Sequence, residues 1–245
     1  MIELISNKII LNNGYEIREY YTNKGNVRAL IYDECIQSII YIDDKNKNSL
    51  VLDYFNYYNL LVDLNPAGID CLMLGGGGIS YPRYFINNYS DKNMDVVEID
   101  KKCIDYAKKY FYLDDLLNNN GNRLNIFIDD ALKYVEKCNK KYDYILIDLF
   151  DGKKPINEIY YSHYGEKIKE ILNDNGVIVI NYIFGFSYYN NELLKITSLF
   201  EHYKIISDED NFNTSYNVGN IIIILSNNDI NIPSKYKCKD FSYLV

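Results

Sequence analysis

Basic residues, paired cysteines and long apolar runs are all scarce in this sequence. Lys and Arg number 26 against 34 Asp and Glu, which gives a formal net charge of −8. This balance disfavours DNA or RNA as the main partner, because phosphate binding needs a basic face. The five cysteines include no C-x-x-C pair. They therefore indicate neither a zinc site nor a disulfide framework, and they favour a reducing compartment.

Membrane-targeting features are equally sparse. The N-terminal sequence MIELISNKII has no basic segment and no long apolar segment, so it does not look like a signal peptide. No apolar run approaches the roughly 20 residues that span a bilayer. We therefore expect a cytoplasmic protein with no membrane partner, and its 48% hydrophobic residues can fill a sizeable core.

Hydrophobic patterning divides the chain into two parts. Residues 1–48 hold two strand-like stretches, KIILNNGYEIREYYT and VRALIYDECIQSIIYI, with the turn signal NKGN between them. In residues 49–245, an amphipathic stretch from Leu50 to about Leu64 is followed by short apolar runs that alternate with helical patterns. This alternation is typical of an α/β fold whose mostly parallel sheet is covered by helices on both faces.

The apolar runs define the expected elements of the second part. The last two runs are spaced as a terminal hairpin. The sequence LLNNNGN at 116–122 predicts a polar loop. We expect strands at 71–74, 94–99, 124–128, 142–147, 176–183, 203–207 and 218–225.

Four consecutive glycines, Gly75–Gly78, follow the first of these runs. Glycine loses much conformational entropy on folding, so such a run needs a reason. Backbone N–H groups of a glycine loop that precedes a helix can approach a ligand closely. Glu98 ends the next strand, about 20 residues further on, where an acidic side chain commonly binds ribose hydroxyls. The G-x-G-x-x-G pattern fails at Ser80, which disfavours NAD and FAD.

Acidic residues lie at the ends of three consecutive predicted strands, the second to the fourth. Glu98 ends one strand, Asp129 and Asp130 follow the next, and Asp148 and Asp151 follow the fourth. Ligands of open parallel sheets bind beyond the carboxyl ends of the strands, so these side chains should meet at one edge. The pattern predicts a nucleoside-binding crevice with an acidic pocket beside it. For Asp148 and Asp151 alone, a helix-capping or turn role is the simpler alternative.

The chain resembles the spermidine synthase family of polyamine aminopropyltransferases. The resemblance spans about residues 15–226 and is carried by LMLGGGG (72–78), VVEIDKKCIDYAKKYF (96–111), RLNIFIDDALKYV (123–135), KYDYILIDLFDG (141–152) and GVIVIN (176–181). It implies the Rossmann-like fold of S-adenosylmethionine-dependent methyltransferases, with a seven-stranded sheet and a small N-terminal β domain. It also implies a homodimer or homotetramer that acts on a small-molecule amine and needs no metal.

The resemblance assigns roles to residues on the nucleoside side of the crevice. It implies that Glu98 binds the ribose and that Asp130 faces the adenine amino group, with Ala131 nearby. The methionine-derived arm of the co-substrate would pass the backbone of the glycine loop. The residues expected to bind the co-substrate are Gly75, Gly76, Gly77, Gly78, Glu98, Asp130, Ala131 and Gln37.

On the amine side, the resemblance makes Asp148 the base that deprotonates the attacking amine. Asp151 would hold an amine of the substrates, and Tyr54 and Tyr216 would contact the acceptor. One amine of a polyamine must stay charged while the other loses its proton, and carboxylates can serve both needs. The sequence therefore predicts Asp148 and Asp151 as catalytic residues.

Three departures from the family pattern lie on the substrate side. Gly78 stands where the family has an Asp that binds the amine of decarboxylated S-adenosylmethionine, DLFDG replaces D-S-x-D-P, and NYIFG (181–185) replaces an E-x-Q stretch. An Asp at position 78 would repel the carboxylate of ordinary S-adenosylmethionine, whereas Gly78 would not. The co-substrate is therefore decarboxylated or ordinary S-adenosylmethionine. Aminopropyl transfer is our main expectation, a methyltransferase with an unknown acceptor is the alternative, and a non-catalytic nucleoside-binding scaffold is a third.

Overall fold

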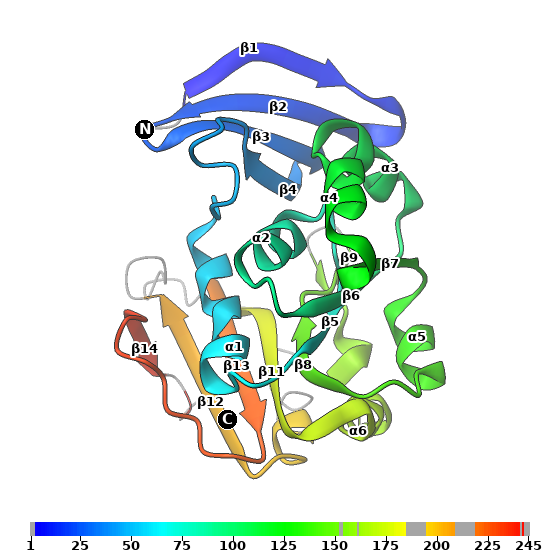
Figure 1. The fold of residues 1–245 in the computed structure, drawn as a ribbon, viewed down its shortest axis with the longest axis vertical. Coiled ribbons are helices and arrows are strands. Elements are labelled where there is room, and N and C mark those ends of the chain that lie inside the picture. The colour runs from blue at the N-terminus through cyan, green and yellow to red at the C-terminus, as the bar shows by residue number, and fades with distance from the viewer. Residues whose placement is uncertain are drawn as a thin grey trace.

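Two β-sheets of different size organise the chain in the computed structural model. The structure describes residues 3–151, 154–160, 162–184, 195–208, 219–240 and 242. An antiparallel sheet with the order β1–β2–β3–β4 stands at the N-terminal end, above an eight-stranded sheet flanked by helices (Figure 1). The small sheet consists of β1 (Glu3–Ile10), β2 (Tyr15–Thr22), β3 (Gly25–Tyr32) and β4 (Cys35–Tyr41).

Each strand-like stretch of the N-terminal part folds into two strands, which the sequence pattern did not predict. The first turn contains the 3₁₀ segment η1 (Asn12–Gly14), and the second is formed by Asp33 and Glu34. Asn13, Asp33 and Glu34 have φ values of 64°, 46° and 64°. Short polar side chains such as Asn and Asp tolerate this left-handed conformation better than most residues do. The turn at Asp33 lacks the usual glycine, which explains why the pattern missed it.

The large sheet has the strand order β14–β12–β13–β11–β8–β5–β6–β7. The five strands from β11 to β7 run parallel, and β13 lies antiparallel between β11 and β12. All seven predicted strands are present, and β14 extends the edge as an unpredicted eighth strand. The strands are β5 (Asp70–Leu74), β6 (Asn93–Glu98), β7 (Leu124–Ile128), β8 (Tyr142–Ile147), β11 (Leu172–Phe184), β12 (His202–Asp208), β13 (Gly219–Ser226) and β14 (Cys238–Asp240).

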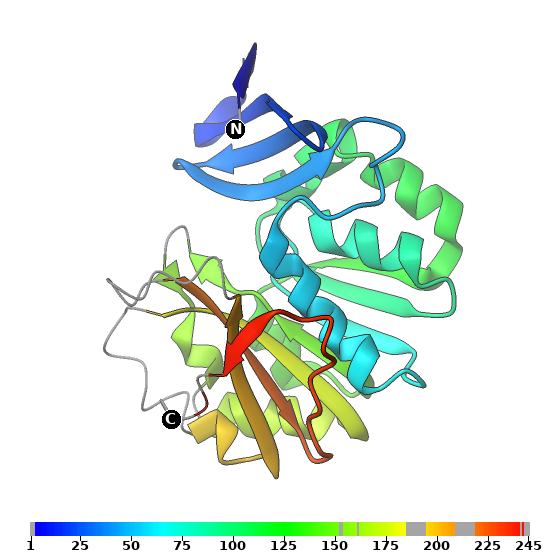
Figure 2. The same ribbon diagram turned by 90° about the vertical axis from the view of Figure 1, so that its left-hand side faces the viewer.

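Helices cover both faces of the large sheet, as Figure 2 shows from the side. Alternate residues of the central strands enter two separate cores: Met73 and Val96 pack with α2 and α3 residues, whereas Leu72 and Val97 pack with α5 and α6 residues. This alternation follows from the two-residue period of a strand. The helices are α1 (Leu60–Leu64), α2 (Ser80–Asn88), α3 (Lys101–Tyr110), α4 (Leu113–Asn120), α5 (Ala131–Lys137) and α6 (Ser162–Ile171). Short elements complete the list: η2 (Asp53–Asn59), η3 (Gly121–Arg123), η4 (Asn157–Tyr160), β9 (Phe150–Asp151) and β10 (Lys154–Pro155).

The helix α4 corrects the expectation of a polar loop at 116–122. Its residues Leu113 and Leu116 are 1% and 6% exposed and belong to the core. Burial of these side chains stabilises a helix whose own composition is unfavourable, because tertiary packing supplies most of the stability of short helices. Within the described part of the chain, no helix is long and apolar enough to cross a membrane.

Hydrogen bonds join the small sheet to the α/β part. The hydroxyl of Tyr15 in β2 donates to Asp100 Oδ2 at 2.7 Å, just before α3. In β4, the backbone N–H of Ile39 donates to Ser80 Oγ at 2.8 Å, and Ser80 Oγ donates to the Ile39 carbonyl at 2.9 Å. Strand β4 is thereby held against the beginning of α2, directly beside the glycine loop.

Candidate active site

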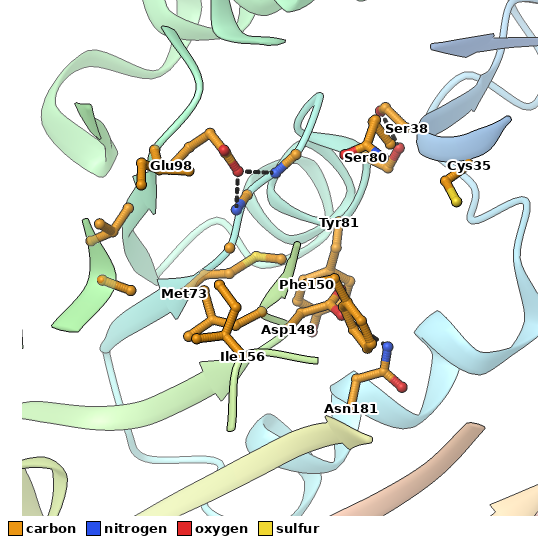
Figure 3. Close-up of a pocket in the computed structure, with 18 of the residues that line it drawn as sticks. Cys35, Ser38, Met73, Ser80, Tyr81, Glu98, Asp148, Phe150, Ile156 and Asn181 are labelled. Atoms are coloured by element: carbon orange, nitrogen blue, oxygen red, sulfur yellow. Dashed lines mark hydrogen bonds between the residues drawn. The ribbon is translucent and has the colours of Figure 1, made fainter. Parts of the chain in front are cut away.

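A cavity of about 580 Å³ opens where the carboxyl ends of the parallel strands meet the small sheet. Figure 3 shows its wall, with Glu98 on one side and Asp148 and Asn181 on another. This is the edge where ligands of open α/β sheets bind. Of the residues expected from the sequence, the cavity is lined by Gly75, Gly76, Gly77, Gln37, Tyr54, Glu98, Asp130, Ala131 and Asp148.

The four glycines of Gly75–Gly78 are required by close neighbours within the protein itself. A Cβ atom on Gly75 would collide with the carbonyl of Asp148, and one on Gly76 would collide with the Val96 side chain. On Gly77, a Cβ would meet the Gln37 carbonyl, and Gly77 also has a φ of 49°. The loop therefore packs against β6, β4 and the residue that follows β8, and these contacts leave no space for side chains.

Gly78, which the sequence predicts to lie beside the co-substrate, is surrounded by residues of the small sheet. It is absent from the described residues that line the cavity. Its N–H donates to the Gln37 carbonyl at 3.3 Å, and a Cβ on it would collide with the Cβ of Ser38. The space that a glycine leaves at this position is therefore filled by β4, because the small sheet packs directly on the loop.

Glu98 accepts hydrogen bonds from the loop that it faces. Its Oε2 atom accepts from Gly77 N at 2.7 Å and from Gly76 N at 3.1 Å, while Oε1 accepts from Asp100 N at 2.9 Å. The dashed lines in Figure 3 mark the two bonds to the loop. A carboxylate has about four acceptor sites, so Glu98 can accept these three bonds and still receive a hydroxyl donor from a ribose.

Asp130 also combines a structural bond with a place in the cavity. It is the N-cap of α5, where its Oδ1 atom accepts from Leu132 N at 2.9 Å and from Lys133 N at 3.3 Å. No hydrogen bond engages its Oδ2 atom in the described part of the chain. The neighbouring Ala131 is 9% exposed and lines the same end of the cavity. This end of the cavity therefore combines the free Oδ2 atom of Asp130 with the apolar surface of Ala131.

Asp148 follows β8 and is held by side chains rather than by backbone groups. The hydroxyl of Tyr58 donates to its Oδ2 atom at 2.9 Å, and Asn181 Nδ2 donates to its Oδ1 atom at 2.8 Å. Burial raises the pKa of Asp148 to about 6, although both hydrogen bonds oppose this rise, and the nearby charge of Glu98 adds to it. A carboxyl with a pKa near the working pH is suited to accept a proton.

The remaining predicted residues are placed to different degrees. Tyr54 lines the cavity, and burial together with the charge of Asp148 raises the pKa of its hydroxyl. The backbone of Asp151 lies in β9, two residues from the cavity residue Leu149. Tyr216 lies outside the described residues.

The sequence analysis missed Tyr58, and it placed Asn181 on the substrate side only as part of the stretch 181–185 without giving it a role. Tyr58 lies four residues after Tyr54 in the predicted amphipathic stretch, so the shared helical face was a usable signal. Asn181 is a lone amide at the end of the apolar run GVIVINYI, where a buried polar side chain needs a partner. The composition of the pattern did not reveal that Asp148 would be that partner.

The cavity wall is strongly acidic. Its described residues include five carboxylates and no lysine, arginine or histidine. Such a wall attracts cations and repels anions, and the low-dielectric surroundings strengthen both effects. The carboxylates are Glu34, Glu98, Asp129, Asp130 and Asp148. Among the described residues, no three His, Cys, Asp or Glu side chains form a group that could hold a metal ion.

Comparison with known proteins identifies the family. A family model described as the spermine/spermidine synthase domain matches residues 60–196. The chain belongs to the spermine/spermidine synthase family. Among curated proteins it is 34% identical over 154 residues to a polyamine aminopropyltransferase from Saccharolobus solfataricus, covering 62% of this chain and 49% of the relative. It is 30% identical over 167 residues to one from Thermoplasma volcanium, covering 67% of this chain and 59% of the relative. The matched region is thus about half to three fifths of these relatives' length.

Solved structures support the fold of this family member. A probable spermidine synthase from Corynebacterium glutamicum has a TM-score of 0.78 at 19% identity, covering 98% of this chain and 92% of that one. A spermidine synthase in complex with the transition state analogue AdoDATO has a TM-score of 0.66 at 18% identity, covering 96% and 76%. Human methyltransferase-like protein 13, in complex with SAH, has a TM-score of 0.60 at 18% identity, covering 76% and 87%. These matches confirm the expected methyltransferase-like α/β fold.

Proposed function

We propose that this chain is a polyamine aminopropyltransferase that transfers an aminopropyl group from decarboxylated S-adenosylmethionine to an amine such as putrescine. The observation that carries this proposal is the acidic cavity, whose described wall has five carboxylates and no basic side chain. Decarboxylated S-adenosylmethionine and putrescine are both dications near neutral pH. Ordinary S-adenosylmethionine carries a carboxylate, which this wall would repel.

The residues of the nucleoside end would bind and orient the co-substrate. In this proposal Glu98 binds the ribose hydroxyls, and Asp130 and Ala131 contact the adenine. The loop Gly75–Gly77 and Gln37 lie along the arm that carries the sulfonium. Holding the arm in line with the attacking amine supplies much of the rate enhancement, because the sulfonium is already a good leaving group.

The transfer is a single displacement in which atoms and charges balance. The nitrogen lone pair of the acceptor amine attacks the propyl carbon that is bonded to the sulfonium sulfur. The carbon–sulfur bond breaks, its electron pair stays on sulfur, and neutral 5′-methylthioadenosine leaves. The amine proton passes to Asp148, whose raised pKa of about 6 makes it a better base than an exposed carboxylate. Tyr54 and Asp151 are proposed to hold the acceptor.

A methyltransferase is the second candidate, favoured by one observation. No carboxylate occupies position 78, and the small sheet fills the space beside Gly78. An enzyme that accepts ordinary S-adenosylmethionine does not need a carboxylate there. The acidic wall nevertheless favours the decarboxylated co-substrate, and the raised pKa of Asp148 argues against a purely structural scaffold.

Calorimetric titration with the two co-substrates tests the proposal. We expect decarboxylated S-adenosylmethionine to bind at least tenfold more tightly than the ordinary form, a difference of about 1.4 kcal/mol. Titration with 5′-methylthioadenosine, which lacks the sulfonium charge and the charged amine chain, is the control for an intact nucleoside site. Equal or tighter binding of ordinary S-adenosylmethionine would contradict aminopropyl transfer and support methyl transfer.

We also propose a cytoplasmic homodimer or homotetramer whose subunits meet through a separate domain of residues 1–48. The small sheet supports this, because it exposes large apolar side chains that a partner could cover: Tyr21 and Ile9 are 52% and 45% exposed. Light scattering after size-exclusion chromatography tests the assembly, and a monomeric mass at micromolar concentration would contradict it. Tyr21→Lys should weaken the assembly without affecting nucleoside binding.

A further inference from the structure

A second cavity, of about 470 Å³, shares no residue with the candidate active site in the described structure. It opens between the segment 42–48, α2 and α4, and the two helices lie side by side below the small sheet (Figure 1). Helix α2 contributes Arg83 and Asn87 to its wall, and α4 with the residue before it contributes Tyr112 and Asp115. The proposed transfer reaction gives this cavity no task.

Arg83 brings a buried positive charge to this wall. It is 7% exposed, and its Nη1 atom is buried without a hydrogen-bond partner in the described structure. Burial lowers the pKa of the guanidinium, and the opposing electrostatic effect comes from Tyr112 rather than from a carboxylate. Arginine is almost never fully buried unless it is paired, because a desolvated charge without a partner destabilises the fold. Arg83 therefore has the features of a group whose partner is a ligand.

Tyr112 covers one face of this guanidinium but not its edge. The Cζ atom of Arg83 lies 5.2 Å from the centroid of the Tyr112 ring. Tyr112 has a φ of 60° just before α4, a left-handed conformation that is rare for a bulky residue. A cation–π contact uses the face of the guanidinium, whereas its N–H donors point outward in its plane. The edge is therefore left for an acceptor, and an oxyanion can accept two parallel hydrogen bonds there.

The other charged side chains of the described wall are exposed. Lys47 and Asp44 form an ion pair with each other at 3.7 Å, and Asp115 also faces solvent. Water and salt screen exposed charges, whereas the buried charge of Arg83 is screened much less. Arg83 therefore has the strongest effect on a ligand inside the cavity. The two exposed carboxylates disfavour an anion with several charges, which leaves a small anion with one charge.

We propose that this cavity binds a small oxyanion, preferably the carboxylate group of a small molecule, and that Arg83 holds it through the edge of its guanidinium. The inference does not rest on the proposed aminopropyl transfer. A bound oxyanion would supply the acceptor that Nη1 lacks and would neutralise the buried charge. Asn87 adds a donor from the next turn of α2. Its Nδ2 atom donates to Asn48 Oδ1 at 3.1 Å, and an amide nitrogen has a second N–H.

Urea unfolding of the whole chain tests this site with two anions as probes. Sodium chloride is replaced stepwise by sodium acetate or sodium phosphate at constant ionic strength and pH 7.5. A ligand that binds the folded chain raises the free energy of unfolding in a saturable way, from which its Kd follows. We expect such saturation in wild type, with a lower Kd for acetate than for phosphate, which is largely a dianion at this pH.

Three variants separate Arg83 from a general effect of salt. Arg83→Met should abolish the saturable response and should be at least as stable as wild type in chloride, because no desolvated charge remains. Asn87→Asp places a carboxylate four residues after Arg83, where it can pair with the guanidinium and compete with the anion. It should raise the Kd of acetate about tenfold. Asn88→Asp makes the same change of charge at an exposed residue outside the cavity wall and should leave this Kd within about twofold of wild type.

Each outcome supports or overturns the site. An unsaturable response of wild type to both anions would overturn it and would leave Arg83 solvated by water alone. Equal weakening by Asn87→Asp and Asn88→Asp would also overturn it, since the effect would then come from net charge. Tighter binding of phosphate than of acetate would overturn the preference for a carboxylate. If Arg83→Met does not fold, the comparison of the two aspartate variants decides the question, because both substitutions are at exposed residues.

Discussion

The two ends of the cavity hold their carboxylates in different ways. At the nucleoside end, Glu98 and Asp130 accept hydrogen bonds from backbone N–H groups of the glycine loop, the residue before α3 and the first turn of α5. At the amine end, Asp148 accepts hydrogen bonds only from the side chains of Tyr58 and Asn181 in the described structure. Backbone donors are fixed by the fold, whereas side-chain donors can change with a single residue.

This difference matches the tasks that we propose for the two ends. A nucleoside site must keep one shape. The backbone hydrogen bonds to Glu98 fix the carboxylate that we propose binds the ribose. A base must change its protonation state, and the pKa of about 6 for Asp148 results from burial opposed by two side-chain hydrogen bonds. Substitutions at the nucleoside end should therefore affect binding, and those at the amine end should affect turnover.

Asp148→Asn should produce the largest effect. The amide cannot accept the amine proton, so the rate of product formation should fall by about 10²–10⁴-fold. The Kd of 5′-methylthioadenosine should remain within twofold of wild type, because Asp148 lies at the other end of the cavity. Chromatographic detection of the product polyamine measures the loss. Turnover within threefold of wild type would remove Asp148 from the role of base.

Glu98→Ala should affect binding first. It removes a charged acceptor, and hydrogen bonds to charged groups are worth about 1.5–3 kcal/mol, so the Kd of 5′-methylthioadenosine should rise by at least tenfold. The loss also leaves Gly76 N and Gly77 N without their partner. Glu98→Gln is the matched control, since it retains one acceptor oxygen and should weaken binding less. Unchanged affinity in both variants would show that the nucleoside does not contact Glu98.

Gly78→Ala should reduce stability rather than catalysis. Its Cβ would collide with the Cβ of Ser38, and such overpacking costs about 1–3 kcal/mol. Urea unfolding of the variant measures the change in the free energy of unfolding. In a Ser38→Gly background, Gly78→Ala should lower the free energy of unfolding less than it does in wild type, because the colliding Cβ of residue 38 is absent. If Gly78→Ala is as stable as wild type, the small sheet does not pack on the loop as described.

The pH dependence should give the smallest effect. The ionised form of Asp148 is the one that accepts a proton, so kcat/KM should rise with pH as the carboxyl titrates near its pKa of about 6. Below that pH, Asp148 is protonated and turnover falls, while the Kd of 5′-methylthioadenosine should stay nearly constant between pH 5.5 and 7.5. An acid limb near pH 4 would mean that burial does not raise the pKa of Asp148.

Most of the large sheet could be predicted because its strands are local apolar runs. The predicted runs at 124–128 and 142–147 coincide with β7 (Leu124–Ile128) and β8 (Tyr142–Ile147). The three-residue strand β14 has the sequence CKD, which carries no strand signal. It is a strand only through its pairing with β12. The helix α4 was missed for the same reason, since contacts with the core override its polar composition.

The candidate site could be predicted where its chemistry follows the strand order. Glu98, Asp130 and Asp148 all follow parallel strands, and parallel strands place their carboxyl ends at one edge. Tyr58 and Asn181 could not be assigned in this way, because their roles depend on a contact with Asp148 across 90 and 33 residues. Pattern analysis recognises side chains of the right type but not which of them meet.

The sequence by itself determined the family, the α/β architecture and the acidic residues at the strand ends, because hydrophobic period and residue type are local properties. Only the tertiary structure decided what the glycines of Gly75–Gly78 are for. The packing of β4 on the loop makes Gly78 a neighbour of Ser38. Tertiary packing also buried Asp148 between two side-chain donors and left one oxygen of Asn181 unpaired. These features arise from contacts between distant segments, which no local pattern records.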